Sequence, residues 1–237
     1  MTKDPKMGKS DLKHRYILFP VFCIMISCST IKSEMKNIDI NESKLASKLT
    51  EAGFSGLFQY GERSLCDSIW QDGKNQKTLI SIVSNTKHND YTRLLASEVL
   101  YAKTNEYPPA NLDDALAYIY SQALEISGEN EGSLLSGNLW GFMYHTDRLG
   151  ISNYGILGKH LIECGISAIP NLKKILDNDN LLYYEGSRDA TTGNMLKYRV
   201  KDAAAYYIGK IAGVPIQFYE NYPERDAEIE RLKDKLK

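Results

Sequence analysis

Two apolar arms with a polar loop between them govern how this chain can fold. The first arm reads Gly165-Ile-Ser-Ala-Ile-Pro-Asn-Leu-Lys-Lys-Ile-Leu176, and the second reads Tyr198-Arg-Val-Lys-Asp-Ala-Ala-Ala-Tyr-Tyr-Ile-Gly-Lys-Ile-Ala-Gly213. The apolar residues of each arm recur every three or four positions, which is the spacing of one face of a helix. In the second arm this face consists of Val200, Ala203, Ala204, Tyr207, Ile208 and Ile211. Its central alanines would let another helix approach closely, so the arms are predicted to pack as a helix pair.

The two arms also carry a family likeness. Residues Ala168–Leu176 follow the pattern Ala-Ile-Pro-x-Leu-x-x-Ile-Leu, and residues Arg199–Ile208 contain Asp-Ala-Ala. This pair resembles a HEAT-type helical repeat, and residues 76–103 give a weaker second unit. The resemblance implies an all-α, HEAT-like helical array (a short α-solenoid) over residues 46–237. An irregular helical bundle with the same apolar stripes is the alternative.

The rest of the body also shows helical periodicity, and no strand-like alternation is sustained. Asp90 and Asn111 are each predicted to cap a helix, Gly165 to follow one, and Ser167 to cap the helix that contains Pro170. The glycine-rich and aromatic residues from Ser127 to Ser152 are predicted to form a packed connecting loop. The predicted helices span residues 45–60, 65–70, 76–83, 91–102, 112–126, 154–164 and 223–236.

The first 27 residues have the parts of a secretory signal peptide. They contain five Lys or Arg and two Asp, a net charge of +3 that leaves −4 for the rest of a chain whose formal charge is −1. The apolar run Tyr16–Ser27 would be about 18 Å long as a helix, which is too short for a hydrocarbon core of about 30 Å. Its end, Met25-Ile-Ser-Cys28, resembles a bacterial lipobox.

The lipobox resemblance implies cleavage before Cys28 and lipidation of that cysteine, which would anchor the protein to a membrane without spanning it. Residues 28–45 are polar and are predicted to form a tether. Ser29 after the cysteine resembles outer-membrane sorting in bacteria that have two membranes. We therefore expect an exported protein of the cell envelope that faces the periplasm or the surface. The chain lacks the basic block of a nucleic-acid binder, so no nucleic-acid partner is predicted.

The histidines do not predict a metal site. His14, His88, His145 and His160 show no H-x-x-H or H-E-x-x-H spacing, whereas a zinc site needs three or four converging ligands. His160 precedes the apolar Leu161 and is interpreted as lying on the flank of its helix. No metal and no cofactor are predicted.

The cysteines outside the leader and the lipobox leave two alternatives. An exported protein could oxidise Cys66 and Cys164 to a disulfide. Both lie in apolar helical phase, and buried free thiols are favoured.

The sequence also shows no phosphate-binding loop, G-x-S-x-G elbow or S-x-x-K motif that leads into a helix. A catalytic role is not predicted.

The long loop from Asp177 to Lys197 is the best candidate for function, because loops of about 20 residues in compact domains are commonly functional or disordered. Tyr184 and Arg188 are the predicted partner-binding residues, since tyrosine and arginine dominate interface hot spots. An ion-paired structural plug is the competing interpretation. Arg199 and Asp202, at positions i and i+3, are expected to form a surface pair.

These features predict a membrane-anchored lipoprotein that binds or scaffolds a protein partner. An envelope hydrolase that uses carboxylates of the 177–197 loop is one alternative, and it would need two acids about 5–9.5 Å apart in a cleft. A toxin-immunity-type protein is another, because a mildly acidic body would suit a basic partner.

Overall fold

The described part of the protein is helical. The computed structural model describes residues 41–59, 63–128, 142, 145–146, 152–153, 155–182, 195–217 and 219–237. All of them belong to one compact unit, Ile40–Lys237. The predicted leader, Cys28 and most of the tether lie outside the described residues. Among the described helices, none is long and apolar enough to cross a membrane.

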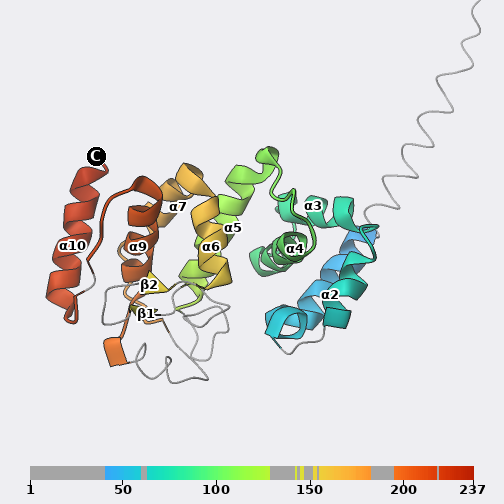
Figure 1. Cartoon of the computed structure of the whole chain (residues 1–237), viewed down its shortest axis with the longest axis horizontal. Helices are drawn as coiled ribbons and strands as arrows, with labels where there is room; N and C mark the ends of the chain where they lie inside the picture. Colours follow the sequence, from blue (N-terminus) through green and yellow to red (C-terminus); the bar gives the residue numbers. More distant parts are fainter. Residues whose placement is uncertain are drawn as a thin grey trace, which may run out of the picture. The chain divides into compact units, whose positions relative to one another are not determined.

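The all-α prediction is confirmed over these residues, with one two-residue antiparallel ladder as the exception (Figure 1). A helix at residues 41–54 runs into a π-helical turn, so the end of the predicted tether is already helical. The labelled elements are η2 (Ser55–Gln59), α2 (Arg63–Trp70), α3 (Gln76–Ser84), α4 (Asp90–Lys103), η3 (Ala110–Leu112), α5 (Asp113–Ile126), β1 (His145–Thr146), β2 (Ser152–Asn153), α6 (Ile156–Glu163), η4 (Gly165–Ala168), α7 (Ile169–Lys174), α9 (Val200–Ala212) and α10 (Tyr222–Lys235).

Three of the predicted helix starts are wrong in detail. Asn89, not Asp90, caps α4, because its extended backbone lets its side-chain oxygen accept the Thr92 N–H at 2.7 Å. Asn111 lies inside the 3₁₀ turn η3, and α5 begins after it without a side-chain cap. Ser167 likewise lies inside η4, and α7 begins at Ile169. A short 3₁₀ turn thus takes the place of the predicted cap twice.

The predicted left-handed glycine after α6 is confirmed. Gly165 has φ +62°, and Gly213 ends α9 in the same way at φ +69°. Within α9, Gly209 has a different role: it lets the segment that contains Val214 and Ile216 pack closely against the helix. A β-carbon at Gly209 would lie 2.6 Å from the Val214 carbonyl oxygen, so the segment after α9 can fold back only over a glycine.

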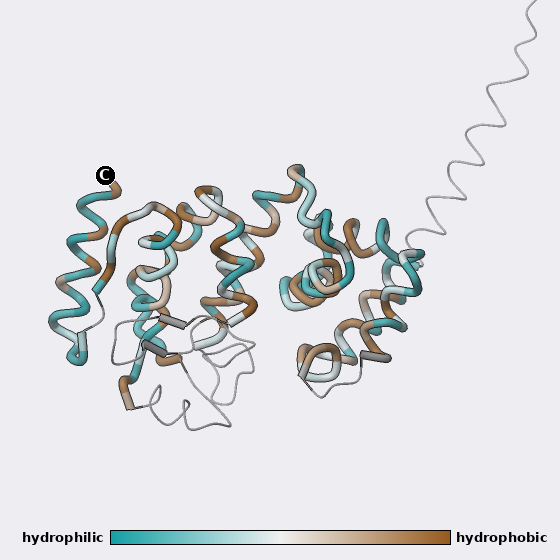
Figure 2. Tube along the Cα trace, in the orientation of Figure 1, coloured by the Kyte–Doolittle hydropathy of each residue, from teal (hydrophilic) through white to brown (hydrophobic). Residues whose placement is uncertain are grey.

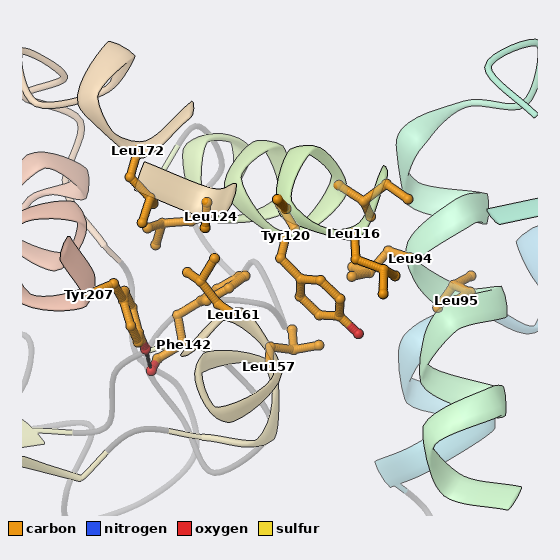
Figure 3. Close-up of a cluster of buried hydrophobic side chains, with 14 of the residues drawn as sticks. Leu94, Leu95, Leu116, Tyr120, Leu124, Phe142, Leu157, Leu161, Leu172 and Tyr207 are labelled. Carbon is orange, nitrogen blue, oxygen red and sulfur yellow. Dashed lines mark hydrogen bonds between the residues drawn. The ribbon is translucent and has the colours of Figure 1, made fainter. Parts of the chain in front are cut away.

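The core forms where the apolar stripes of α5, α6, α7 and α9 meet. Figure 3 shows Leu157 and Leu161 of α6 beside Tyr120 of α5. Phe142, from the predicted connecting loop, is also fully buried, and its carbonyl oxygen accepts a hydrogen bond from Tyr207 of α9. The predicted stripe of α9 is confirmed except at its end: Ile211 is half-buried, and the other members are all buried (Val200, Ala203, Ala204, Tyr207 and Ile208). Ala205 and Tyr206, outside the stripe, are buried as well.

The last helix, α10, buries much less apolar surface. Most of its residues are hydrophilic (Figure 2), and its buried side chains are Arg225, Ile229 and Leu232. It packs on α9. Because one of these three side chains is charged, ion pairs contribute to its attachment alongside apolar contacts.

Candidate binding site

The two ends of the 177–197 loop are joined to each other by backbone hydrogen bonds. Leu182 N–H donates to the Tyr198 carbonyl at 2.8 Å, and Val200 N–H donates to the Asn180 carbonyl at 2.8 Å. Leu181 and Arg199 form an antiparallel bridge between these bonds. The outgoing and returning segments, which we call the loop stems, therefore lie side by side.

Apolar residues secure the loop stems to the core. Leu182, Tyr198 and Val200 are buried, as is Leu176 at the end of the preceding helical arm. Two apolar side chains at the stems are nevertheless exposed: Leu181 is 48% exposed and Met195 is 71% exposed. The predicted contact residues Tyr184 and Arg188 lie in the segment 183–194, outside the described residues.

A partly buried ion network underlies the stems, and it corrects the expectation that Arg199 and Asp202 form a surface pair. Both residues are buried. Asp202 accepts the Arg199 backbone N–H at 2.9 Å and its guanidinium Nη2 at 2.8 Å, which also caps α9. Arg199 contacts Asp226 of α10 at 2.8 Å and Asp179 of the outgoing stem at 3.2 Å. The network therefore joins a loop stem, the start of α9 and the last helix.

Arg225 of α10 holds the returning stem directly. Its buried guanidinium donates to the carbonyls of Leu196 at 2.8 Å and of Lys197 at 3.3 Å, and it pairs with Asp202 at 3.3 Å. The Tyr198 ring lies 4.6 Å from it, a cation–π distance. No local pattern indicates this role, because Arg225 lies 27 or more residues away from the stem that it binds.

The network also shifts the ionisation of its members. Hydrogen bonding and charge from Lys201 lower the pKa of Asp179. Burial raises the pKa of Asp226, but hydrogen bonds from Arg199 and Lys201 outweigh it and leave the pKa lowered. For Arg199, burial favours the neutral form, whereas the two aspartates favour the charged form and raise its pKa overall. The network is thus strongest with every member charged.

Each of the two described loop acids is paired with a lysine. Asp177 is ion-paired to Lys233 at 2.8 Å, and Asp179 to Lys201 at 2.7 Å. Glu185 and Asp189 lie outside the described residues. Within the described part of the chain, no cluster of three or more His, Cys, Asp or Glu could hold a metal ion.

Cys66 and Cys164 are free thiols, as favoured from the sequence, although Cys164 is half-buried and not fully buried as expected. Burial raises the pKa of both, and that of Cys164 reaches about 12. A thiol with such a pKa is protonated at neutral pH and is a poor nucleophile.

A second polar cluster corrects the interpretation of His160 as a flank residue. His160 is buried, and its Nδ1 lies 2.7 Å from Oε1 of the equally buried Glu98 on α4. His160 follows Leu157 by three positions, so it lies on the apolar face of α6. This spacing could have predicted from the sequence that His160 is buried. Glu98 was missed altogether, because a lone charged residue inside a helix is usually placed on the surface.

Comparisons with protein families, with curated proteins and with solved structures give no match for this chain.

Proposed function

We propose that this protein is an exported, lipid-anchored protein of the cell envelope that binds a protein partner through its 177–197 loop. The observation that carries the binding role is the construction of the loop stems. They are held by backbone bonds and buried ions, yet they leave Leu181 and Met195 exposed. A rigid base with apolar residues at its edge suits a binding loop, because little ordering entropy is then lost on association.

The body that presents this loop is proposed to be a HEAT-like array. Most contacts join helices that are near neighbours along the chain: α2 and α3 with α4, α3 and α4 with α5, α5 with α6 and α7, and α9 with α6, α7 and α10. The contact between α5 and α9 spans a longer stretch of chain. Such near-neighbour packing supports a stack of helical units in which each unit buries its face against the next. Arrays of this kind present extended surfaces to partners.

The proposed anchor is Cys28, with the outer membrane favoured where two membranes are present. The support comes from the basic leader, the short apolar run and the Ser27-Cys28 junction. The Cys28→Ala protein should lose palmitate labelling and leave the membrane fraction once it is matured. A variant that still fractionates with membranes and labels like the wild type would contradict the anchor.

The binding role is tested by capture of a partner from envelope extract with the full chain as bait. The double variant Tyr184→Ala, Arg188→Ala should lose capture while its thermal midpoint stays close to that of the wild type. Met195→Ser, at the exposed edge of the loop base, should weaken capture. Ile166→Ser is the matched control, because Ile166 is 78% exposed but lies in η4, outside the loop.

A structural plug predicts the reverse pattern. The double variant would then lose stability, as truncation of buried aromatic residues does, while capture would fall no further than unfolding explains. Equal loss of capture in Ile166→Ser and Met195→Ser would also contradict a loop-specific surface.

A further inference from the structure

A partly enclosed cavity of about 250 Å³ lies between the 41–59 segment, α4 and α6. Its walls include Phe54 and Phe58, whose ring centroids are 5.2 Å apart, and Tyr101. Glu98 and His160 contribute the buried polar groups. This combination of an apolar, largely aromatic lining with a few convergent polar atoms is typical of small-molecule sites.

A chain of hydroxyl groups defines the hydrogen-bonding state of Glu98. Tyr120 Oη donates to Glu98 Oε1, so the Ser97 hydroxyl, 3.0 Å away, must donate to Tyr120. Tyr107 Oη, 3.0 Å from Ser97 Oγ, then donates to Ser97. Every hydroxyl hydrogen in this chain points toward Glu98 Oε1, so this oxygen serves as the final acceptor.

The same carboxylate fixes the histidine. Glu98 Oε1 accepts from His160 Nδ1 at 2.7 Å, so Nδ1 carries a proton, and in the neutral form of the ring Nε2 is the acceptor. The Tyr101 ring stacks on the imidazole with centroids 3.6 Å apart and holds its plane. His160 is therefore oriented by two neighbours, on α4, before any ligand arrives.

Two acceptor atoms remain without hydrogen bonds. Within the described residues, no donor reaches Glu98 Oε2 or His160 Nε2, although both residues line the cavity. Neither atom is among the enclosed, unpaired polar atoms of the described residues, so both are accessible from the cavity to a ligand. A positively charged donor would satisfy both and would balance the charge of Glu98.

The one cationic side chain of the described lining does not meet this need. Lys159 is 64% exposed at its side chain, and its Nζ lies 3.7 Å from Glu163 Oε1 on the surface of α6. The aromatic walls instead favour a cation on the ligand, because the faces of aromatic rings attract positive charge.

We propose that this cavity binds a small organic cation, an amine attached to a compact apolar group. The ammonium donates to Glu98 and His160, and the apolar group contacts Phe54 and Phe58. The size of the cavity limits the ligand to about one ring with a short side chain. This site is separate from the 177–197 loop and does not depend on the proposed protein partner.

Calorimetric titration of the purified full chain with benzylamine tests the proposal, with benzyl alcohol and benzoate as neutral and anionic analogues of similar shape. We expect saturable binding of benzylamine at least tenfold tighter than that of either analogue. Glu98→Gln keeps the shape but removes the charge, and it should weaken benzylamine at least tenfold, equivalent to 1.4 kcal/mol. Glu163→Gln is the matched control, because Glu163 lies on the surface of α6 and does not line the cavity, and it should not weaken binding.

Three results would overturn the proposal. The first is that the wild type shows no saturable binding of benzylamine. The second is that benzoate or benzyl alcohol binds as tightly as the amine, and the third is that a folded Glu98→Gln protein keeps its affinity for benzylamine. If Glu98→Gln does not fold, Ala102→Trp decides the question. It adds bulk to the cavity wall without touching the polar chain, so retained benzylamine affinity would place the binding elsewhere.

Discussion

The buried network under the loop stems gives the sharpest stability prediction, through Asp202→Ala. The Asp202 carboxylate accepts from Arg199 N at 2.9 Å, Arg199 Nη2 at 2.8 Å and Arg225 Nη1 at 3.3 Å. Both arginines are buried. Removing one partner of a buried ion pair costs about 3–5 kcal/mol, because the remaining charge stays desolvated. Arg199 keeps Asp226 and Asp179, so we expect a cost near the lower end, about 3 kcal/mol.

In a unit of this size, about 3 kcal/mol lowers the thermal midpoint by about 6–12 °C. Far-ultraviolet circular dichroism during heating and in urea measures the loss. Asp234→Ala is the control, because Asp234 forms an exposed i, i+3 pair with Lys237, and it should move the midpoint by no more than about 1 °C. A shift for Asp202→Ala as small as that of the control would refute the idea that the network stabilises the fold.

Three further predictions concern other parts of the core. Ala204→Leu should cost about 1–3 kcal/mol by overpacking, since Ala204 is fully buried in α9; an unchanged thermal midpoint would contradict close packing there. Tyr101→Phe should raise stability by about 1 kcal/mol, because Tyr101 Oη is buried without a hydrogen-bond partner among the described residues; a lower urea midpoint would show that the hydroxyl is satisfied. For Glu42, burial raises the pKa but three side-chain hydrogen bonds outweigh it, so the pKa lies below 4.5. The stability that Glu42 contributes is therefore present above pH 4.5 and is lost as the pH falls through the folded pKa. Urea titration at several pH values measures this, and in Glu42→Gln the free energy of unfolding should fall less on acidification than in the wild type.

The sequence predicted the apolar faces of the helices well. In α9, five of the six residues identified by their spacing are buried, and Ile211, at the end of the helix, is half-buried. Periodicity succeeds here because burial of an apolar face is a property of one helix and needs no knowledge of its neighbour. The same reasoning predicted Gly165 at the end of α6, where a left-handed residue is needed.

Helix starts were harder to predict, because adjacent residues compete for the capping position. Asn89 and Asp90 are both good caps by type, and the choice depends on which of them adopts an extended backbone. At Asn111 and Ser167 the chain forms a 3₁₀ turn before the helix begins. These outcomes depend on how the preceding segment packs, and local sequence does not record that.

Buried polar residues could not be predicted from local patterns. Glu98 and His160 are 62 positions apart, and the buried partners Asp202 and Arg225 are 23 apart. Residue type alone places charged side chains on the surface. Each of these becomes a core residue only because a partner on another helix compensates the cost of removing it from water.

The loop stems rest on buried charged residues, Arg199, Asp202 and Arg225, as well as on apolar ones. Well-packed apolar residues could stabilise such a base equally well or better, so stability alone does not account for buried arginines. Arg225 differs from an apolar residue in what it specifies: its planar guanidinium donates to the Leu196 and Lys197 carbonyls and to Asp202 at once. These bonds fix the position of the returning stem relative to α10, whereas an apolar contact would allow it to slide. A base that fixes the position of its stems in this way would suit the binding role proposed for the 177–197 loop, because the stems would not need to be ordered by a partner.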